Sequence, residues 1–196
     1  MALGHLGEWV REARAVVEAV VLDENLIGGL DRWGSGDETA ELLLTFTDAV
    51  VDSNITKLSL KTCGLGAAAC AHALPRLLES ARLTDLNLSD NGLTGATRGN
   101  YSQPWDKNID INLEGWSKTC DKLKASNLVT LSLQKTGLGA AALRKLATSL
   151  PAAIARLSIA GEFRILHIAP GTHDNTSLTN CIVHIALRNG SKRSRG

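Results

Sequence analysis

The sequence predicts an α/β fold made of stacked repeating units, each with one short strand and one helix. The stretch LSLKTCGLGAAAC, residues 58–70, recurs as LSLQKTGLGAAAL, residues 131–143, with nine of thirteen letters identical. Each copy begins with apolar residues in the order L-x-x-L-x-L, and the same order occurs at other places in the chain. Because one such unit cannot bury its own apolar face, we expect neighbouring units to stack.

Five apolar triplets define the expected strands. Leu86 lies 28 residues after Leu58, and Leu131 lies 45 residues after Leu86, which is one 28-residue period plus an insertion of 17. The last two residues of each triplet are two positions apart, so in a strand they face the same side, toward the core. The pattern predicts strands near residues 17–22, 55–60, 83–88, 128–133 and 154–159. The triplets are Val17, Val20 and Leu22; Ile55, Leu58 and Leu60; Leu83, Leu86 and Leu88; Leu128, Leu131 and Leu133; and Ile154, Leu157 and Ile159.

The residue that closes the turn after each strand is small and able to form hydrogen bonds. Such a side chain satisfies loop backbone groups that would otherwise be buried without partners. We therefore predict a structural turn role for Asn25, Cys63, Asn91 and Thr136. Helices are expected over residues 67–80 and 140–151, where apolar residues recur at i, i+3, i+4 and i+7, with Pro75 and Pro151 marking late turns or exits.

Two insertions, near residues 31–52 and 97–124, interrupt the period. The first places Trp33 in a Gly-rich loop before a predicted helix, and the second holds Tyr101 and Trp105 before another helix, on which Trp116 is expected in the core. Insertions in repeat proteins collect on one face and often bind, and Tyr and Trp are common interface anchors. Trp105 has two interpretations, as an anchor for a partner or as a cover for the lengthened helix.

A period near 28 residues with the order L-x-x-L-x-L-x-x-N/C-x-L resembles leucine-rich repeats, over residues 9–162. The GLGAAA continuation is similar to the ribonuclease-inhibitor type, as in the repeat regions of nucleotide-sensing innate-immune receptors and in Ran GTPase-activating proteins. The resemblance implies a right-handed α/β horseshoe arc, with a short parallel sheet on the concave face and helices on the convex face. Residues 1–162 then form an array of about five units, and residues 163–196 a degenerate C-terminal cap with a strand near 178–187 and a basic tail.

Solenoids of this kind bind partners on their concave face, which the outward-pointing strand residues line. We expect a non-catalytic module that binds a protein partner through this face and through the aromatic insertion. The expected partner-binding residues are Lys57, Ser59, Lys61, Asp85, Asn87, Thr130, Ser132, Gln134 and Arg156 on the strands, with Tyr101 and Trp105 on the insertion.

Catalytic motifs are not found in the sequence. It contains no H-E-x-x-H or C-x-x-C spacing, no G-x-x-x-x-G-K-[ST] loop and no G-x-S-x-G elbow, so we expect no enzyme activity, metal or cofactor. Two other hypotheses stay open. The likeness to Ran GTPase-activating proteins suggests a regulator of GTP hydrolysis, and the loss of pattern after Ile159 suggests a truncated repeat protein without a specific partner.

Composition sets the remaining expectations. Lys plus Arg number 21 and Asp plus Glu 20, so we expect no nucleic-acid partner. No apolar run reaches the ~20 residues that a membrane helix needs, and the first residues lack the pattern of a secretory signal. Four cysteines, Cys63, Cys70, Cys120 and Cys181, show no metal or disulfide spacing and are expected as buried thiols. We therefore expect a cytoplasmic protein that is monomeric or associates weakly through the ends of the array.

Overall fold

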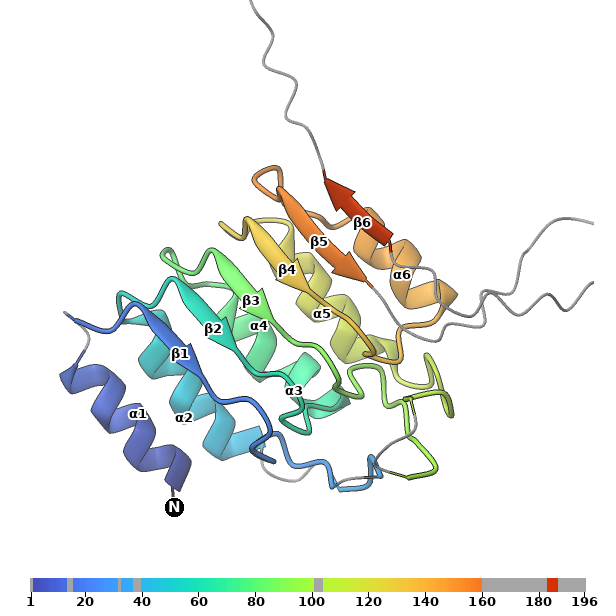
Figure 1. Cartoon of the computed structure of the whole chain (residues 1–196), viewed down its shortest axis with the longest axis horizontal. Helices are drawn as coiled ribbons and strands as arrows, with labels where there is room; N and C mark the ends of the chain where they lie inside the picture. Colours follow the sequence, from blue (N-terminus) through green and yellow to red (C-terminus); the bar gives the residue numbers. More distant parts are fainter. Residues whose placement is uncertain are drawn as a thin grey trace, which may run out of the picture.

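The strands lie side by side in one sheet, in the order in which they occur along the chain (Figure 1). The structure, a computed structural model, describes residues 2–13, 16–31, 33–36, 40–100, 104–159 and 183–186. The strands are β1 (Ala19–Val21), β2 (Lys57–Ser59), β3 (Asp85–Asn87), β4 (Thr130–Ser132), β5 (Arg156–Ile159) and β6 (Val183–Ala186). From β1 to β5 every neighbouring pair is parallel, which confirms the α/β class with a parallel sheet.

The register of the sheet aligns the middle residues of the five repeated triplets. Val20 pairs with Leu58, Leu58 with Leu86, Leu86 with Leu131, and Leu131 with Leu157. All five side chains are buried. This is the register that the repeated triplets predict, and it places equivalent leucines next to each other across the sheet.

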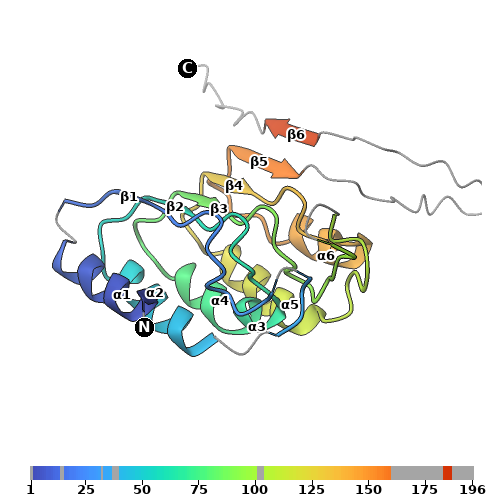
Figure 2. The same ribbon diagram turned by 60° about the horizontal axis from the view of Figure 1, so that its bottom comes forward.

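Helices cover one face of the sheet, and the described residues leave the other face open (Figure 2). We call this second face the open face; it corresponds to the predicted concave face. The helices are α1 (Ala2–Glu12), α2 (Ala40–Val51), α3 (Ala67–Ala71), α4 (Ala73–Leu77), α5 (Leu113–Leu123) and α6 (Ala140–Ala147).

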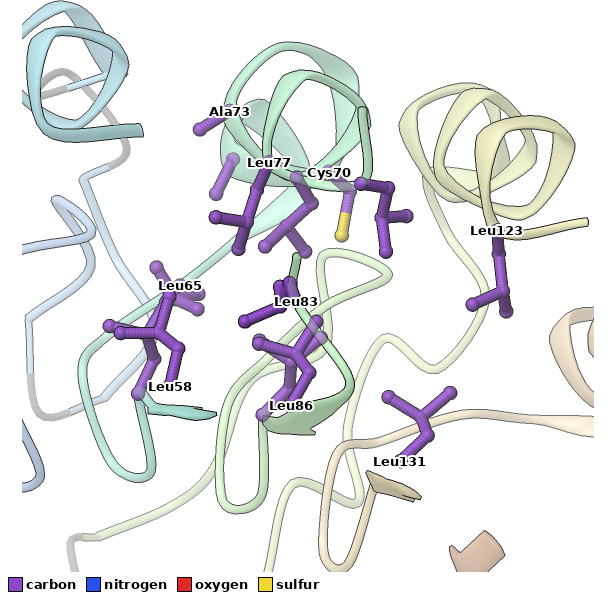
Figure 3. Packing of buried hydrophobic residues seen from close by; sticks show 14 of the residues in the cluster. Leu58, Leu65, Cys70, Ala73, Leu77, Leu83, Leu86, Leu123 and Leu131 are labelled. Atoms are coloured by element: carbon purple, nitrogen blue, oxygen red, sulfur yellow. The ribbon is translucent and has the colours of Figure 1, made fainter. Parts of the chain in front are cut away.

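The core lies between the sheet and the helices. Figure 3 shows Leu58, Leu86 and Leu131 in a row on neighbouring strands, with Leu77 of α4 above them. Burial of one such leucine side chain stabilises the fold by about 1.5–3 kcal/mol. One cluster runs from Val20 to Leu157, so the units share a continuous core.

The helix expected over residues 67–80 is two short helices. The chain breaks at His72, whose φ is −129° and ψ −62°, and helix α4 then continues through Pro75 to Leu77. Proline has no N–H to donate, and its ring would clash with the carbonyl group of Ala71, four residues earlier. Pro75 therefore interrupts this helix instead of marking its late turn or its exit.

The two ends of the sheet differ. Strand β6 pairs antiparallel with β5, with Leu157 opposite Ile185, so a strand within the expected range 178–187 closes this end. The rest of the predicted cap and tail, residues 163–182 and 187–196, lies outside the described residues. At the other end, helix α1 packs against α2, and Val10 of α1 is fully buried.

Candidate functional site

The loops at the carboxyl ends of the strands are held by the turn side chains. Asn91 is fully buried. Its amide nitrogen donates to three carbonyl oxygens at 2.9–3.1 Å, those of Leu60, Leu88 and Ser89. Its Oδ1 accepts from two backbone N–H groups at 3.0 Å, those of Cys63 and Leu65. One side chain thus joins two neighbouring units.

The equivalent side chains make fewer bonds of the same kind. Asn25 Nδ2 donates to the carbonyl oxygen of Leu22 at 3.0 Å, and Thr136 Oγ1 donates to that of Leu133 at 3.0 Å. Cys63 Sγ donates to the carbonyl oxygen of Leu22 at 3.0 Å and so reaches the preceding unit. These bonds determine the path of the loops that border the open face.

Burial controls the chemistry of the thiols. Loss of hydration raises the pKa of Cys63 to about 12, and the same effect raises the pKa of Cys120 to about 12. The thiolate is the nucleophilic form of cysteine, so both thiols stay protonated and unreactive at neutral pH.

We expect Cys63 and Cys120 in the folded protein to react with iodoacetamide at least ~100-fold more slowly than in the unfolded chain, at a pH of about 8.5. Because folding raises both pKa values above the usual thiol value of 9.0, the two thiols stabilise the fold fully below that pH, and this contribution is lost as pH rises toward 12. Peptide mapping after timed labelling measures both rates. Equal labelling rates in the folded and unfolded protein would contradict the burial of these thiols.

The centre of the open face carries small polar side chains joined by hydrogen bonds. Asn87 Nδ2 donates to Ser59 Oγ at 3.0 Å, and Ser59 Oγ donates to Asp23 Oδ1 at 2.5 Å. The backbone N–H of Lys61 donates to the same Asp23 oxygen at 3.1 Å. Ser132 continues this central row on β4, opposite Asn87. Hydrogen bonds therefore hold this row from Asp23, after β1, to Asn87 on β3.

Charged side chains flank this row. Lys57, Lys61 and Arg156 are exposed, and none of them takes part in an ion pair found among the described residues. Asp85 Oδ2 accepts from the hydroxyl group of Thr84 at 2.8 Å. The remaining predicted positions, Thr130 and Gln134, are half-buried. The structure thus brings the nine predicted strand residues together on the open face.

Charges on the helix side pair with one another. Arg76 bonds Asp48 of α2 at 2.7 Å and Glu79 at 2.7 Å, and Lys122 of α5 bonds Glu79 as well. Exposed pairs of this kind contribute about 0–1 kcal/mol each. Arg144 of α6 and Lys124 at the end of α5 take part in none of the ion pairs found among the described residues, so only part of the charge on this side is paired.

Trp105 lies inside the fold. Its side chain is 3% exposed, and its Nε1 donates to Asp90 Oδ1 at 3.0 Å. The guanidinium group of Arg98 lies 4.2 Å from the centre of the indole ring and bonds the same Asp90 oxygen at 3.3 Å. The ring is not accessible as a partner anchor, so of its two interpretations the structure favours the covering role. Tyr101 lies outside the described residues.

An exposed tryptophan lies beside this cluster. Trp33 is 54% exposed, and its carbonyl oxygen accepts from the N–H of Arg98 at 3.2 Å. Asp31 Oδ1 accepts from the N–H groups of Trp33 and Ser35 at 2.8 Å, and these bonds lower the pKa of Asp31. The two insertions therefore meet at one edge of the fold. The sequence predicts Trp33 in a loop but does not mark it as a site residue; Gly34 and Gly36, which follow it, are the available signal.

Asp110, in the second insertion, holds the start of α6. Its Oδ1 accepts from the N–H of Gly139 at 2.9 Å, and its Oδ2 accepts from the N–H groups of Ala141 and Ala142 at 2.9 and 3.3 Å. A carboxylate at this position satisfies N–H groups that have no partner within the helix and interacts favourably with the helix dipole.

We expect Asp110→Asn to lower the free energy of unfolding by about 1 kcal/mol, because the amide offers one acceptor oxygen in place of two and carries no charge. Asparagine tolerates the backbone angle of this position, a φ of 59°, so the change tests the cap and not the turn. Urea unfolding measures the difference. Exposed Asp106 is the control, since Asp106→Asn is expected to change stability by less than ~0.5 kcal/mol; equal effects would contradict the capping role.

Together these features define a leucine-rich-repeat-like α/β fold. The solved C-terminal domain of tropomodulin from Caenorhabditis elegans is similar, with a TM-score of 0.54 and 16% sequence identity over 81% of this chain and 83% of that chain. At this identity the likeness shows the fold alone. No protein family profile and no curated protein matches the sequence.

None of the helices in the described part of the chain has the length and apolar character needed to cross a membrane. Groups of three or more potential metal-ligating side chains are likewise not found in that part of the chain.

Proposed function

We propose that this chain is a non-catalytic protein-interaction module whose protein partner binds the open face of the sheet. In this proposal the units form a right-handed solenoid of the ribonuclease-inhibitor type, and the open face is its concave side. The observation that carries the proposal is the continuous row of small polar side chains on β2, β3 and β4, flanked by cations without ion-pair partners among the described residues.

The size and charge of these side chains support the proposal. Serine and asparagine in the central row allow the backbone of a partner to come close and to form hydrogen bonds. Lys57, Lys61 and Arg156 add exposed positive charge, which favours acidic groups on the partner and increases the rate of association. Exposed Trp33, at the edge where the insertions meet, supplies an aromatic anchor of the kind that dominates protein interfaces.

The character of the polar groups supports a role without catalysis. The thiols of Cys63 and Cys120 are protonated at neutral pH. The hydroxyl group of Ser59 donates to a carboxylate, and no described histidine side chain bonds it as a base. The buried thiols of Cys63, Cys70 and Cys120 suit a reducing compartment, so we propose a cytoplasmic location.

Charge reversal on the open face tests the proposal. Partners are captured from the source cells with the unchanged protein, with Lys57→Glu/Lys61→Glu/Arg156→Glu, and with a control that reverses three exposed cations elsewhere, Arg82→Glu/Lys118→Glu/Lys124→Glu. Both variants change the net charge equally. We expect the captured amount of at least one protein to fall about tenfold or more with the open-face variant and to stay unchanged with the control. Truncation or reversal of charged groups in an interface typically has an effect of this size.

The binding is then repeated with the purified partner, and circular dichroism confirms that both variants fold. Equal capture by both variants would show that the open face is not the binding surface.

A further inference from the structure

Strand β1 has an unpaired edge within the described part of the chain. It pairs only with β2, at one end of the sheet. Glu18 O accepts from Lys57 N–H and Leu22 N–H donates to Ser59 O, so the even-numbered residues bond toward β2. Backbone groups alternate in direction along a strand, and those of Ala19 and Val21 therefore point away from the sheet.

Apolar side chains around this edge are left uncovered. Val16 is 83% exposed, Val21 69% and Leu26 48%. Helix α1 lies in the helix layer, where it packs against α2 (Figure 2). Leu22 is only partly buried, whereas Leu60, its equivalent in the next unit, is fully buried. The first unit thus exposes core surface that its neighbours hide, and repeat arrays need such surface to be capped.

The charge of this unit is strongly acidic. Residues 16–31 contain four acidic residues and no Lys, Arg or His, although the whole chain has a net charge of +1. Glu18 and Glu24 are exposed beside the edge, and Asp23 is partly exposed. A second copy paired edge to edge would bring two such acidic units together, which is unfavourable. A basic segment would meet complementary charge.

The opposite end of the sheet shows how an edge of this fold is closed. There, β6 adds to β5 as an antiparallel strand, although 23 residues separate the two strands in the sequence. We propose that the β1 edge binds an extended, apolar segment of a partner protein that carries lysine or arginine, and that the segment adds as a further strand. This site is distinct from the open face and does not depend on the function proposed for that face.

A labelled peptide of alternating Lys and Val residues tests this proposal by fluorescence anisotropy, with a peptide of alternating Glu and Val as the charge control. We expect the basic peptide to bind, the acidic peptide to bind at least about tenfold more weakly, and raised salt to weaken the basic peptide. Glu18→Lys/Glu24→Lys is expected to reverse the preference. Equal binding of both peptides, or binding of neither, would overturn the proposal.

Ala19→Pro separates edge pairing from adhesion to the apolar patch. Proline removes the outward N–H of Ala19 and is tolerated on an edge strand, whereas the matched Ala19→Thr keeps that N–H. We expect a loss of about tenfold or more in affinity for Ala19→Pro and little change for Ala19→Thr. Unchanged binding by a folded Ala19→Pro would contradict strand addition. Sedimentation that shows a dimer lost only in Ala19→Pro would assign the edge to a second copy instead. We expect the open-face variant, Lys57→Glu/Lys61→Glu/Arg156→Glu, to bind the peptide as the unchanged protein does. Failure of this proposal can therefore be distinguished from failure of the proposed function.

Discussion

Replacement of Asn91 by alanine is expected to lower the free energy of unfolding by about 4 kcal/mol, because buried backbone groups would be left without its hydrogen bonds. The two N–H groups of Cys63 and Leu65 lose their acceptor, and the carbonyl oxygens of Leu60 and Leu88 lose the amide donor. The carbonyl oxygen of Ser89 also loses that donor but still accepts from the N–H of Thr62 at 2.9 Å. Each buried polar group left without a partner costs about 1–3 kcal/mol, and local relaxation recovers part of the total. The expected loss is a large fraction of the stability of a small protein, about 5–15 kcal/mol.

Asn25→Ala is the matched control. Asn25 occupies the same position in the first unit, but it is exposed, and its side chain donates to the carbonyl oxygens of Leu22 and Asp23. Water can replace these bonds, so we expect a loss below ~1 kcal/mol. Urea unfolding followed by tryptophan fluorescence gives both values. Equal losses for the two variants would show that Asn91 does not join the units as the hydrogen bonds indicate.

Truncation of the central leucine has the second largest expected effect. Leu86→Ala is expected to lower the free energy of unfolding by about 3–4 kcal/mol. Leu86 is 2% exposed and lies between Leu58 and Leu131, which hold their positions on β2 and β4. Because strands on both sides prevent collapse around the missing atoms, most of the cavity should remain.

Leu26 provides the comparison for this variant. It is 48% exposed in the first unit, so Leu26→Ala removes the same atoms from a place where water already reaches them. We expect a loss below ~1 kcal/mol, measured by urea unfolding under the same conditions. A loss at Leu86 no greater than that at Leu26 would contradict the shared core.

The strands and their register could be predicted because the constraint is local and repeated. Each unit must place two apolar residues, two positions apart, on the core side of a short strand. The triplets around Leu58, Leu86 and Leu131 therefore predict the same strand and register at three places in the sequence. The turn positions follow from the same repetition. The surface of the open face could also be predicted, because residues that alternate with the core leucines must point outward.

Other features depend on contacts that the repeat does not encode. The break at His72 arises from one proline, and the antiparallel direction of β6 arises where the pattern has already decayed. The burial of Trp105 depends on Asp90, in the preceding loop, and on Arg98, eight residues further on. Sequence alone reveals an aromatic residue in an insertion, but not the acceptor and the cation that hold it inside. Helix α1 was not predicted either, because its apolar residues do not belong to a repeated triplet.

Methyl nuclear Overhauser contacts between the spine leucines test the central claim most directly. Neighbouring strands lie about 4.8 Å apart, and strands two positions apart lie about twice as far. We predict cross-peaks between Leu58 and Leu86 and between Leu86 and Leu131, and none between Leu58 and Leu131. A direct contact between Leu58 and Leu131, or no contact of either with Leu86, would contradict the sheet order on which the open face and the β1 edge both depend.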